Sequence, residues 1–323
     1  MSWTQKNEIF TETAHMMSTT VSIIEKDFWV VWVLGRIFSD ARLNSILIFK
    51  GGTSLSKVFH LIGRFSEDID LILDWRLVTQ EDPYKERSSN QQNRFNTQTN
   101  DNAKNYIQNT LLGILEELLS PYCRCSIEPD GFSLSIEYPS NFKDTYIKPT
   151  ILLEIGPLAS WLPHDSFEIE SFVAEQFPAL FTQSKCRVNT IVAERTFWEK
   201  VTILHHEANR PENSLMPSRY SRHYYDLAIM AQSNVKEMAL SDLNLLKNVI
   251  EFKQRFYPRT WAKYDQAFSK NIKLMPPKYR IAELKKDYSA MKEMIFSKYI
   301  SFEEILETLE RLEIEIRSLF ISQ

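Results

Sequence analysis

The pattern of apolar and polar positions predicts strands alternating with helices in the first half of the chain and mostly helices in the second. Residues 46–49 form an apolar run that stops at Gly51 and Gly52 and resumes with helical spacing, which predicts a strand, a tight turn and a helix. A second strand follows and carries Asp68 and Asp70. Further strands are predicted at residues 123–129, 132–138, 146–155 and 186–191.

Apolar residues recur at helical spacing in residues 25–35, in residues 106–119 and in most of the chain from about residue 168 onward. Near the end, Ser301 and Glu304 have the spacing of a capping box, which predicts that a helix begins there. The chain is therefore expected to combine a strand-containing part with a mostly helical part.

One long segment has no such period. Residues 75–104 are rich in Ser, Asn, Gln and Thr, and a segment of this composition cannot bury enough apolar surface to stay rigid alone. We therefore expect a long mobile loop. It either closes on a substrate or is a tolerated insertion.

The composition narrows the class of protein. Of the 323 residues, 43% are hydrophobic and 25% are charged, which suits a globular protein of one large or two modest domains. The formal net charge of −4 argues against a protein that coats nucleic acid indiscriminately, although a local basic patch stays open. The sequence begins without the basic-then-apolar order of a signal peptide, and its longest apolar run, residues 28–34, is too short to span a bilayer. We expect a cytoplasmic protein with no membrane partner.

Neither the cysteines nor the adjacent histidines have the spacing of a zinc site. Cys123, Cys125 and Cys186 do not make a zinc site or a disulfide framework, so we expect reduced packing residues. His205 and His206 are adjacent, and adjacent side chains point about 100° apart on a helix. No His-Glu-x-x-His pattern is present, so we expect these histidines to be surface or core residues.

The segment from Gly51 to Asp70 carries the candidate chemistry. A glycine pair between a strand and a helix permits a positive φ and the close approach of an anion, which the free N–H groups of the first helical turn then face. Asp68 and Asp70 are separated by one residue, so both carboxylates project from one face of the strand while Ile69 and Leu71 face the core. Two carboxylates held this close repel each other unless a cation lies between them, and their oxygens suit Mg²⁺. The sequence predicts a metal–triphosphate site.

A single acid, Glu154, lies in the otherwise apolar strand at residues 146–155. An unpaired carboxylate in a buried strand is costly unless a metal, a cation or a proton neutralises it. Glu154 is therefore a candidate for contact with a metal, a cation or a proton. The alternative is a strand-edge acid that faces water.

These motifs resemble a known superfamily. Gly51 and Gly52 followed by Asp68 and Asp70 resemble the signature of the polymerase-β-type nucleotidyltransferases. The longer strings around both motifs resemble the AbiEii/AbiGii toxin branch, which includes the MenA-type toxins; they are residues 49–57 and 64–71. The spacer between the glycines and the first aspartate is longer than in most of the superfamily and suits that branch.

The resemblance implies an α/β (α+β) fold in two parts. A nucleotidyltransferase domain with a mixed sheet is expected over residues 1–160. A mostly helical domain that completes the cleft is expected over residues 161–323.

The resemblance also implies roles for particular side chains. Asp68, Asp70 and Glu154 would bind two Mg²⁺ ions, the third carboxylate holding one metal or taking the proton of the acceptor. Lys200 and Asp226 match a lysine and an aspartate of the family's later motifs. Lys200 would neutralise the triphosphate, and Asp226 would orient Lys200. The alternative for this pair is a solvated lysine and an aspartate on a helix surface.

Further side chains are expected to contact the nucleotide or shape its site. Lys26 lies in a string similar to one that precedes the glycine motif in the family, and is a candidate for reaching phosphate. Arg64 and Ser66 would shape the turn that fixes the carboxylates. The residues expected to cradle the phosphates, together with one lysine that adds positive charge, are Gly51, Gly52, Thr53, Ser54 and Lys57.

The function implied by the resemblance is that of a toxin of the abortive-infection type, which acts in phage defence and is held in check by a separately encoded antitoxin. Such an enzyme moves a nucleoside monophosphate from an NTP to a hydroxyl, here expected on tRNA, and releases pyrophosphate. Residues 252–286 interleave basic with aromatic residues, as an RNA end would need, or form a solvated helical face. Transfer to a protein or small molecule stays open. So does a catalytically silent nucleotide-binding relative, although the intact Asp68 and Asp70 count against it.

Overall fold

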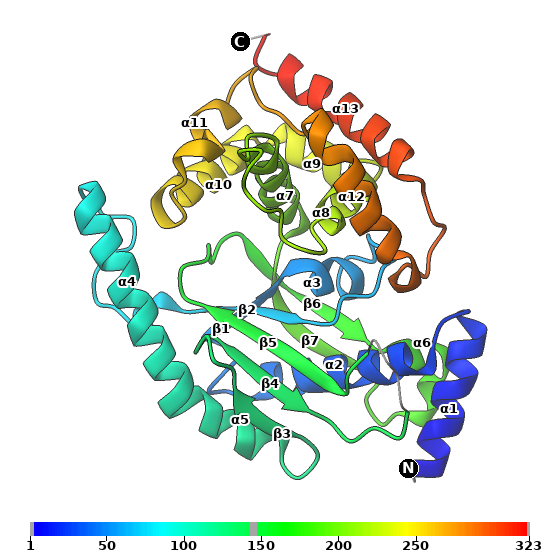
Figure 1. Cartoon of the computed structure of the whole chain (residues 1–323). Helices are drawn as coiled ribbons and strands as arrows, with labels where there is room; N and C mark the ends of the chain where they lie inside the picture. Colours follow the sequence, from blue (N-terminus) through cyan, green and yellow to red (C-terminus); the bar gives the residue numbers. More distant parts are fainter. Residues whose placement is uncertain (1–2, 143–146, 322–323) are drawn as a thin grey trace. The chain divides into compact units, whose positions relative to one another are not determined.

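The computed structural model describes residues 3–142 and 147–321, and the chain divides into two compact units. The sheet unit comprises Met1–Phe59 and Phe65–Ile191, and the helical unit comprises His60–Arg64 and Val192–Gln323. The seven named strands all belong to the sheet unit, as the ribbon in Figure 1 shows. Each unit is described in turn.

The sheet unit contains a mixed seven-stranded sheet with the order β3-β4-β5-β2-β1-β7-β6. The pairs β2–β5 and β1–β7 are parallel, and the other neighbours are antiparallel. The mixed sheet confirms the predicted fold class. Residues 161–191, which the prediction assigns to the helical domain, supply two of its strands. The strands are β1 (Leu47–Lys50), β2 (Ile69–Leu73), β3 (Arg124–Ile127), β4 (Ser133–Glu137), β5 (Thr150–Gly156), β6 (His164–Glu170) and β7 (Lys185–Ile191).

Alternation along β1, β2 and β5 places one set of apolar residues on a single face of the sheet. Phe49, Ile69 and Leu153 belong to a single buried cluster that also contains the apolar side chains of α2 (Val21–Ser39) and α5 (Leu112–Leu119). The residues between them point to the other face, which carries the candidate site. The strand predicted from residue 146 begins at Thr150 in the structure; Tyr146 itself lies outside the described residues.

Helix α2 is buried on nearly every side, because it packs against β7 as well as α1, α5 and α6. Trp29, Val33 and Ile37 are all at most 2% exposed. The Thr20 side chain accepts a hydrogen bond from the Ile23 N–H and caps the helix, which confirms a helix through residues 25–35. The remaining helices of this unit are α1 (Trp3–Met16), α3 (Gly51–Lys57), α4 (Ser89–Tyr106) and α6 (Phe172–Gln176), with short turns η1 (Trp75–Leu77), η2 (Ile107–Leu111) and η3 (Pro178–Leu180).

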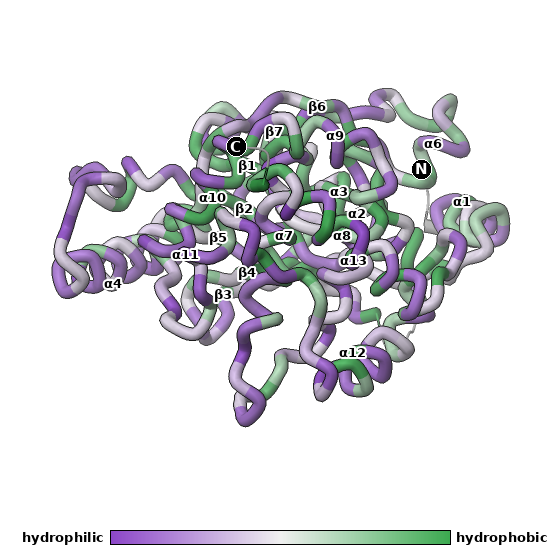
Figure 2. The backbone as a smooth tube through the Cα atoms, turned by 90° about the horizontal axis from the view of Figure 1, so that it is seen from above, coloured by the Kyte–Doolittle hydropathy of each residue, from purple (hydrophilic) through white to green (hydrophobic). Residues whose placement is uncertain are grey.

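The loop predicted over residues 75–104 is wrong for its second half, which forms helix α4. Ser88 and Gln91 make a reciprocal capping box at its start. The helix is largely hydrophilic, as Figure 2 shows, yet it buries one narrow stripe at four-residue spacing. The stripe runs through the π-helical turn η2 into α5 and consists of Phe95, Thr99, Ala103, Ile107, Leu111, Leu115 and Leu119. A stripe one residue wide anchors the polar segment.

The helical unit packs around α7 (Ala193–Ala208), whose residues Phe197, Val201 and Leu204 are fully buried. The predicted capping box of Ser301 and Glu304 is confirmed at the start of α13. The other elements are α8 (Ser221–Met230), α9 (Asn234–Ser241), α10 (Leu243–Phe256), α11 (Tyr264–Ala267), α12 (Lys278–Ala290) and α13 (Phe302–Ser318), with turns η4 (Thr260–Ala262) and η5 (Lys292–Met294). Every helix within residues 3–142 and 147–321 is too short or too polar to cross a membrane.

Candidate active site

Gly51 forms the turn where β1 ends and α3 begins. Its φ is +85°, in the left-handed region that favours glycine. A Cβ atom at this position would lie 1.9 Å from Oδ2 of Asp70, so a side chain here would also collide with that carboxylate. The Ser54 hydroxyl donates to the Gly51 carbonyl at 2.8 Å and holds the turn. Glycine is therefore required both by the backbone conformation and by the close approach of Asp70.

Asp70 and Glu154 lie beside each other on the parallel strands β2 and β5. In register, Lys50 of β1, Asp70, Glu154 and Ser133 of β4 form a row across four strands. Because the strands alternate and these residues are directly paired, their side chains project from the same face of the sheet. The structure thus brings two of the three predicted carboxylates together. It places Glu154 on an interior strand of the sheet, and the residue is exposed.

Asp68 immediately precedes β2, and its backbone is tied to α3. The Thr53 hydroxyl donates to the Asp68 carbonyl, and Thr53 is 1% exposed. The fully buried Ser54 hydroxyl is used within the turn, as described above. Both hydroxyls therefore hold the turn and the strand together. Since both hydroxyls donate to backbone carbonyls, the groups that could form the predicted phosphate cradle are the N–H groups of the first turn of α3, which have no partners within the helix. Ser66 is half-buried two residues before Asp68.

The donor set of this face fits a hard metal ion. Carboxylate oxygens are the ligands that Mg²⁺ prefers, and Asp70 and Glu154 supply them from adjacent strands. Within the described part of the chain, however, no three His, Cys, Asp or Glu side chains gather closely enough to ligate one ion. The full set of Asp68, Asp70 and Glu154 stays a prediction.

Two lysines expected to face phosphate are paired inside the sheet unit. Lys57, the last residue of α3, places Nζ 2.9 Å from Oδ1 of Asp27 and 3.8 Å from Oε1 of Glu175. Lys26 places Nζ 2.9 Å from Oε2 of Glu67. Both lysine side chains are only 3% exposed. Carboxylates of the protein itself therefore pair with both lysines. Lys57 lies at the end of α3 opposite the glycine turn.

In the helical unit, Arg64, Asp226 and Lys200 form a buried ion-pair cluster. Arg64 binds Asp226 with two hydrogen bonds of 2.7 and 2.8 Å, and Nζ of Lys200 lies 2.7 Å from Oδ2 of Asp226. Burial raises the pKa of the Asp226 carboxyl, but Arg64 and Lys200 outweigh it and hold the pKa below its usual range. Burial lowers the pKa of Lys200, and Asp226 opposes that shift. The predicted contact between Lys200 and Asp226 is present, and Arg64 joins it.

His223 lies near this cluster, and it was not identified from the sequence as a candidate site residue. It lies one turn before Asp226 on α8, and its buried Nδ1 has no hydrogen-bond partner among the described residues. Burial first, and then the charges of Lys200 and Arg222, hold its pKa well below the ordinary value. The imidazole is therefore neutral at neutral pH. No periodicity or spacing in the sequence signals this.

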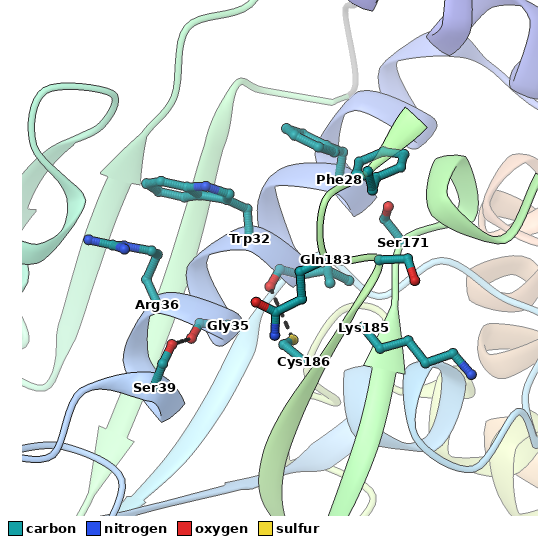
Figure 3. A pocket seen from close by; sticks show the side chains of 12 residues that line it. Phe28, Trp32, Gly35, Arg36, Ser39, Ser171, Gln183, Lys185 and Cys186 are labelled. Atoms are coloured by element: carbon teal, nitrogen blue, oxygen red, sulfur yellow. Dashed lines mark hydrogen bonds between the residues drawn. The ribbon is translucent and has the colours of Figure 1, made fainter. Parts of the chain in front are cut away.

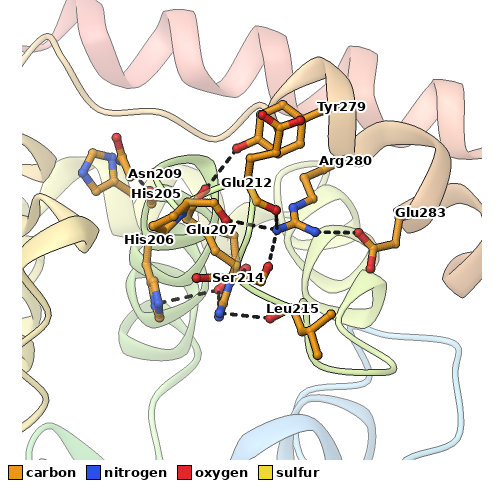
Figure 4. A network of polar contacts seen from close by, with 12 residues as sticks. His205, His206, Glu207, Asn209, Glu212, Ser214, Leu215, Tyr279, Arg280 and Glu283 are labelled. Carbon is orange, nitrogen blue, oxygen red and sulfur yellow. Dashed lines mark hydrogen bonds and ion pairs between the residues drawn. The ribbon is translucent and has the colours of Figure 1, made fainter.

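His205 and His206 are held by packing and hydrogen bonds in the core of the helical unit. The Lys273 N–H donates to Nδ1 of His205 at 3.0 Å, so Nε2 carries the proton and donates to the Lys263 carbonyl at 2.9 Å. The His206 ring lies 4.4 Å from the Trp261 ring, and burial lowers its pKa to about 3. Figure 4 shows the polar network that includes His206 and Glu207. Arg210 binds Glu207 with two hydrogen bonds of 2.7 and 2.8 Å. This agrees with the prediction of surface or core residues.

A cavity of about 220 Å³ lies in the sheet unit away from the predicted site residues. Figure 3 shows Phe28, Trp32 and Gly35 of α2 on one side and Lys185 and Cys186 of β7 on the other. Burial raises the pKa of the Cys186 thiol to about 11, so it is protonated and unreactive at neutral pH. All three cysteines are free, as predicted.

The comparisons with known proteins define the class of protein first: it is a nucleotidyl transferase toxin. The sequence matches the family described as "Nucleotidyl transferase AbiEii toxin, Type IV TA system" over residues 32–308, and the chain therefore belongs to the AbiEii family. Family membership implies an NTP substrate and an antitoxin partner. No curated protein matches the sequence.

The chain is similar to several solved structures, and two of them follow. One is JHP933 from Helicobacter pylori, with 16% identity, 90% of each chain covered and a TM-score of 0.44. The other is MenT4, a nucleotidyltransferase toxin from Mycobacterium tuberculosis, with 15% identity, 96% of this chain and 98% of that chain covered, and a TM-score of 0.45.

Proposed function

We propose that this protein transfers a nucleoside monophosphate from an NTP to a hydroxyl of tRNA and releases pyrophosphate. The observation that carries the proposal is the contact between Gly51 and Asp70, with Glu154 in register beside Asp70. It combines a turn that an anion can approach with carboxylates that suit a divalent cation. Family membership independently supports nucleotidyl transfer.

Asp70, Glu154 and Asp68 are the residues that would hold Mg²⁺. When bound, the ions would supply positive charge to the reacting phosphate and to the attacking hydroxyl. The first turn of α3 would donate N–H groups to the β- and γ-phosphates. The absence of a side chain at Gly51 lets the Asp70 carboxylate lie against the turn. The row of polar residues on this face thus joins the phosphate site to the carboxylates.

Lys200 and Asp226 enter the proposal as a pair. The family's later motifs contain a lysine and an aspartate at the matching positions, and here the two side chains are in contact at 2.7 Å. The second cation, Arg64, keeps the Asp226 carboxylate ionised. We propose that Asp226 fixes the position of the Lys200 ammonium group and that the pair acts as one unit.

The surface of residues 252–286 supports tRNA as the proposed acceptor. Part of the basic charge there is used internally: Arg280 donates to the carbonyls of residues 211, 212 and 214, and Lys285 pairs with Glu303. Other cations and aromatic rings of the segment are exposed, as binding of phosphates and unstacked bases would need. They are Tyr257, Arg259, Lys263, Phe268, Lys270, Lys273, Lys278, Tyr279 and Lys286.

The test is to incubate the purified protein with Mg²⁺, total tRNA and each α-labelled NTP in turn. Label in tRNA with one NTP, lost when EDTA removes the metal, is the expected result. Label on protein would move the acceptor to a protein hydroxyl. Absence of label everywhere would overturn the transfer reaction on these acceptors.

Asp70→Asn tests whether the reaction needs the Asp70 carboxylate, and Asp74→Asn at the other end of β2 is the matched control. Asp74 is buried, whereas Asp70 is half-buried; Asp74 pairs with Arg76 at 2.6 Å and lies outside the row that contains Glu154. We expect Asp70→Asn to abolish transfer and Asp74→Asn to retain it. Equal loss in both variants would mean that activity reports only the integrity of the strand.

A further inference from the structure

Helix α2 contains three consecutive charged residues that are all buried. Glu25 is 1% exposed, and Lys26 and Asp27 are each 2% exposed. Charged side chains are rarely buried to this extent unless they are paired. Here each contacts a different part of the sheet unit. The first contact is with Ser140, whose hydroxyl donates to Glu25.

Asp27 joins α2 to two other helices. Its Oδ1 lies 2.9 Å from Nζ of Lys57, the last residue of α3, and its Oδ2 accepts the N–H of Phe172 at the start of α6 at 2.7 Å. The Lys57 ammonium also lies 3.7 Å from the centre of the Phe172 ring. The position of α3 is thereby fixed at its C-terminal end, opposite the turn at Gly51 that contacts Asp70.

Lys26 contacts the segment that leads into β2. Its partner Glu67 immediately precedes Asp68, and the ion pair is 2.9 Å long. The Asp68 carbonyl in turn accepts the Thr53 hydroxyl of α3. One turn of α2 therefore contacts both segments that form the candidate active site, namely α3 and the residues that lead into β2.

We propose that Lys26 and Asp27 are positioning residues that hold the glycine turn of α3 and the carboxylates of β2 in the geometry needed to bind the nucleotide and its metal. This inference rests on the proposed function. Neither residue is assigned contact with substrate: Asp27 acts through Lys57, and Lys26 acts through Glu67.

The variant Asp27→Asn tests the first arm. Asparagine keeps the shape of the side chain and an oxygen that accepts the Phe172 N–H, but it removes the charge that faces Lys57. Lys57→Met keeps the buried stem of the lysine without its charge, so the double variant Asp27→Asn with Lys57→Met removes the pair as a whole. Lys26→Met with Glu67→Gln tests the second arm. It is the milder change, because the Glu67 side chain is already 16% exposed.

The first readout is backbone hydrogen exchange, which does not depend on activity. In Asp27→Asn we expect faster exchange in peptides that cover residues 51–57 and 66–70, with unchanged exchange in α13. The second readout is binding of the α,β-methylene analogues of ATP, CTP, GTP and UTP in the presence of Mg²⁺. We expect about 10- to 100-fold weaker binding of the analogue that the wild type prefers, the range typical of residues that orient metal ligands.

Glu313→Gln is the matched control. Glu313 is a buried carboxylate of the helical unit that pairs with Arg317 at 2.8 Å and accepts the backbone N–H of Met275 at 3.0 Å. This variant should lower thermal stability and leave analogue binding unchanged. It separates a local loss of position from a general loss of stability.

Two results would overturn the inference. One is wild-type analogue binding in Asp27→Asn and in the Lys26→Met, Glu67→Gln variant. The other is exchange that rises equally throughout the chain. If the wild type neither binds an analogue nor labels any acceptor, the proposed function fails. Local exchange at residues 51–57 then still decides whether the two residues position α3.

Discussion

Asp27 and Asp226 are both buried aspartates paired with a lysine, yet their pKa values move in opposite directions. Asp27 has one cation at 2.9 Å, and that cation, Lys57, also lies 3.8 Å from Glu175. Burial therefore wins and raises the Asp27 pKa, with Lys57 opposing. Asp226 is held by two cations, Arg64 through two hydrogen bonds and Lys200 through one, and its pKa is lowered despite complete burial. The number of cations that a carboxylate has to itself decides the sign.

The comparison separates two uses of a buried charge. In the cluster around Asp226, the carboxylate is ionised and is held by hydrogen bonds from Arg64 and Lys200. At Asp27, burial outweighs the attraction of Lys57, so the pair matters for where it holds α3 rather than for electrostatic stabilisation. This difference predicts a ranking of effects when each partner is removed.

The largest effect on stability is expected for Asp226→Asn. Removal of the carboxylate leaves the Arg64 and Lys200 cations buried side by side, and an uncompensated buried charge costs about 3–5 kcal/mol. Urea unfolding followed by circular dichroism would measure it, with Asp242→Asn as a control at an exposed helix cap. A smaller loss in Asp226→Asn than in Asp27→Asn would contradict the ranking.

The local elements of the site were predictable from the sequence because their signals are local. The apolar run of β1 stops at Gly51, and Asp70 and Glu154 are each flanked by apolar residues, so alternation placed each on the face of its strand opposite those neighbours. The pairing of Asp70 with Glu154 was not predictable from spacing. It depends on the parallel register of β2 and β5, which are separated by a long stretch of chain.

A smaller loss is expected for Asp27→Asn. The variant removes a carboxylate whose burial is already unfavourable, and Lys57 keeps Glu175 nearby, so we expect a loss of about 1–3 kcal/mol, as for a hydrogen bond to a charged group. The same urea titration measures it. A loss as large as that of Asp226→Asn would show that the two pairs are equivalent, against their opposite pKa shifts.

The pH dependence of unfolding sharpens the contrast, because the two signs differ. The Asp226 pKa is lowered in the folded state, so its stabilisation is present above the unfolded value of about 3.9 and is lost as the pH falls below it. The Asp27 pKa is raised, so its favourable contribution is present below about 3.9 and is lost as the pH rises through the folded pKa. Each unit of pKa difference changes the free energy of unfolding by about 1.4 kcal/mol.

The measurement is the free energy of unfolding of the wild type minus that of each variant between about pH 3 and pH 7, the range that brackets the ordinary aspartate pKa. The difference for Asp226→Asn should shrink as the pH falls. The difference for Asp27→Asn should grow as the pH falls. Parallel curves for the two variants would refute the opposite shifts.

What the sequence did not predict depends on contacts between distant residues. Lys26 and Glu67 are 41 positions apart and Arg64 and Asp226 are 162 apart, so no local pattern shows that these charges neutralise each other. Helix α4 was missed for a different reason. Its buried stripe is one residue wide and includes Thr99, so the surrounding Asn and Gln residues conceal the period.

The smallest effect is expected for Glu175→Gln, which brings Asp27 closer to the situation of Asp226. Glu175 competes for the Lys57 ammonium at 3.8 Å, and its side chain is 29% exposed, so the change in stability should stay below about 1 kcal/mol. Its informative consequence is on the neighbour: with Lys57 left to Asp27 alone, the Asp27 pKa should fall toward its ordinary value. Carboxyl-detected NMR titration of the wild type and the variant would measure that fall. An unchanged or higher Asp27 pKa in Glu175→Gln would mean that sharing of the cation does not account for the difference between the two aspartates.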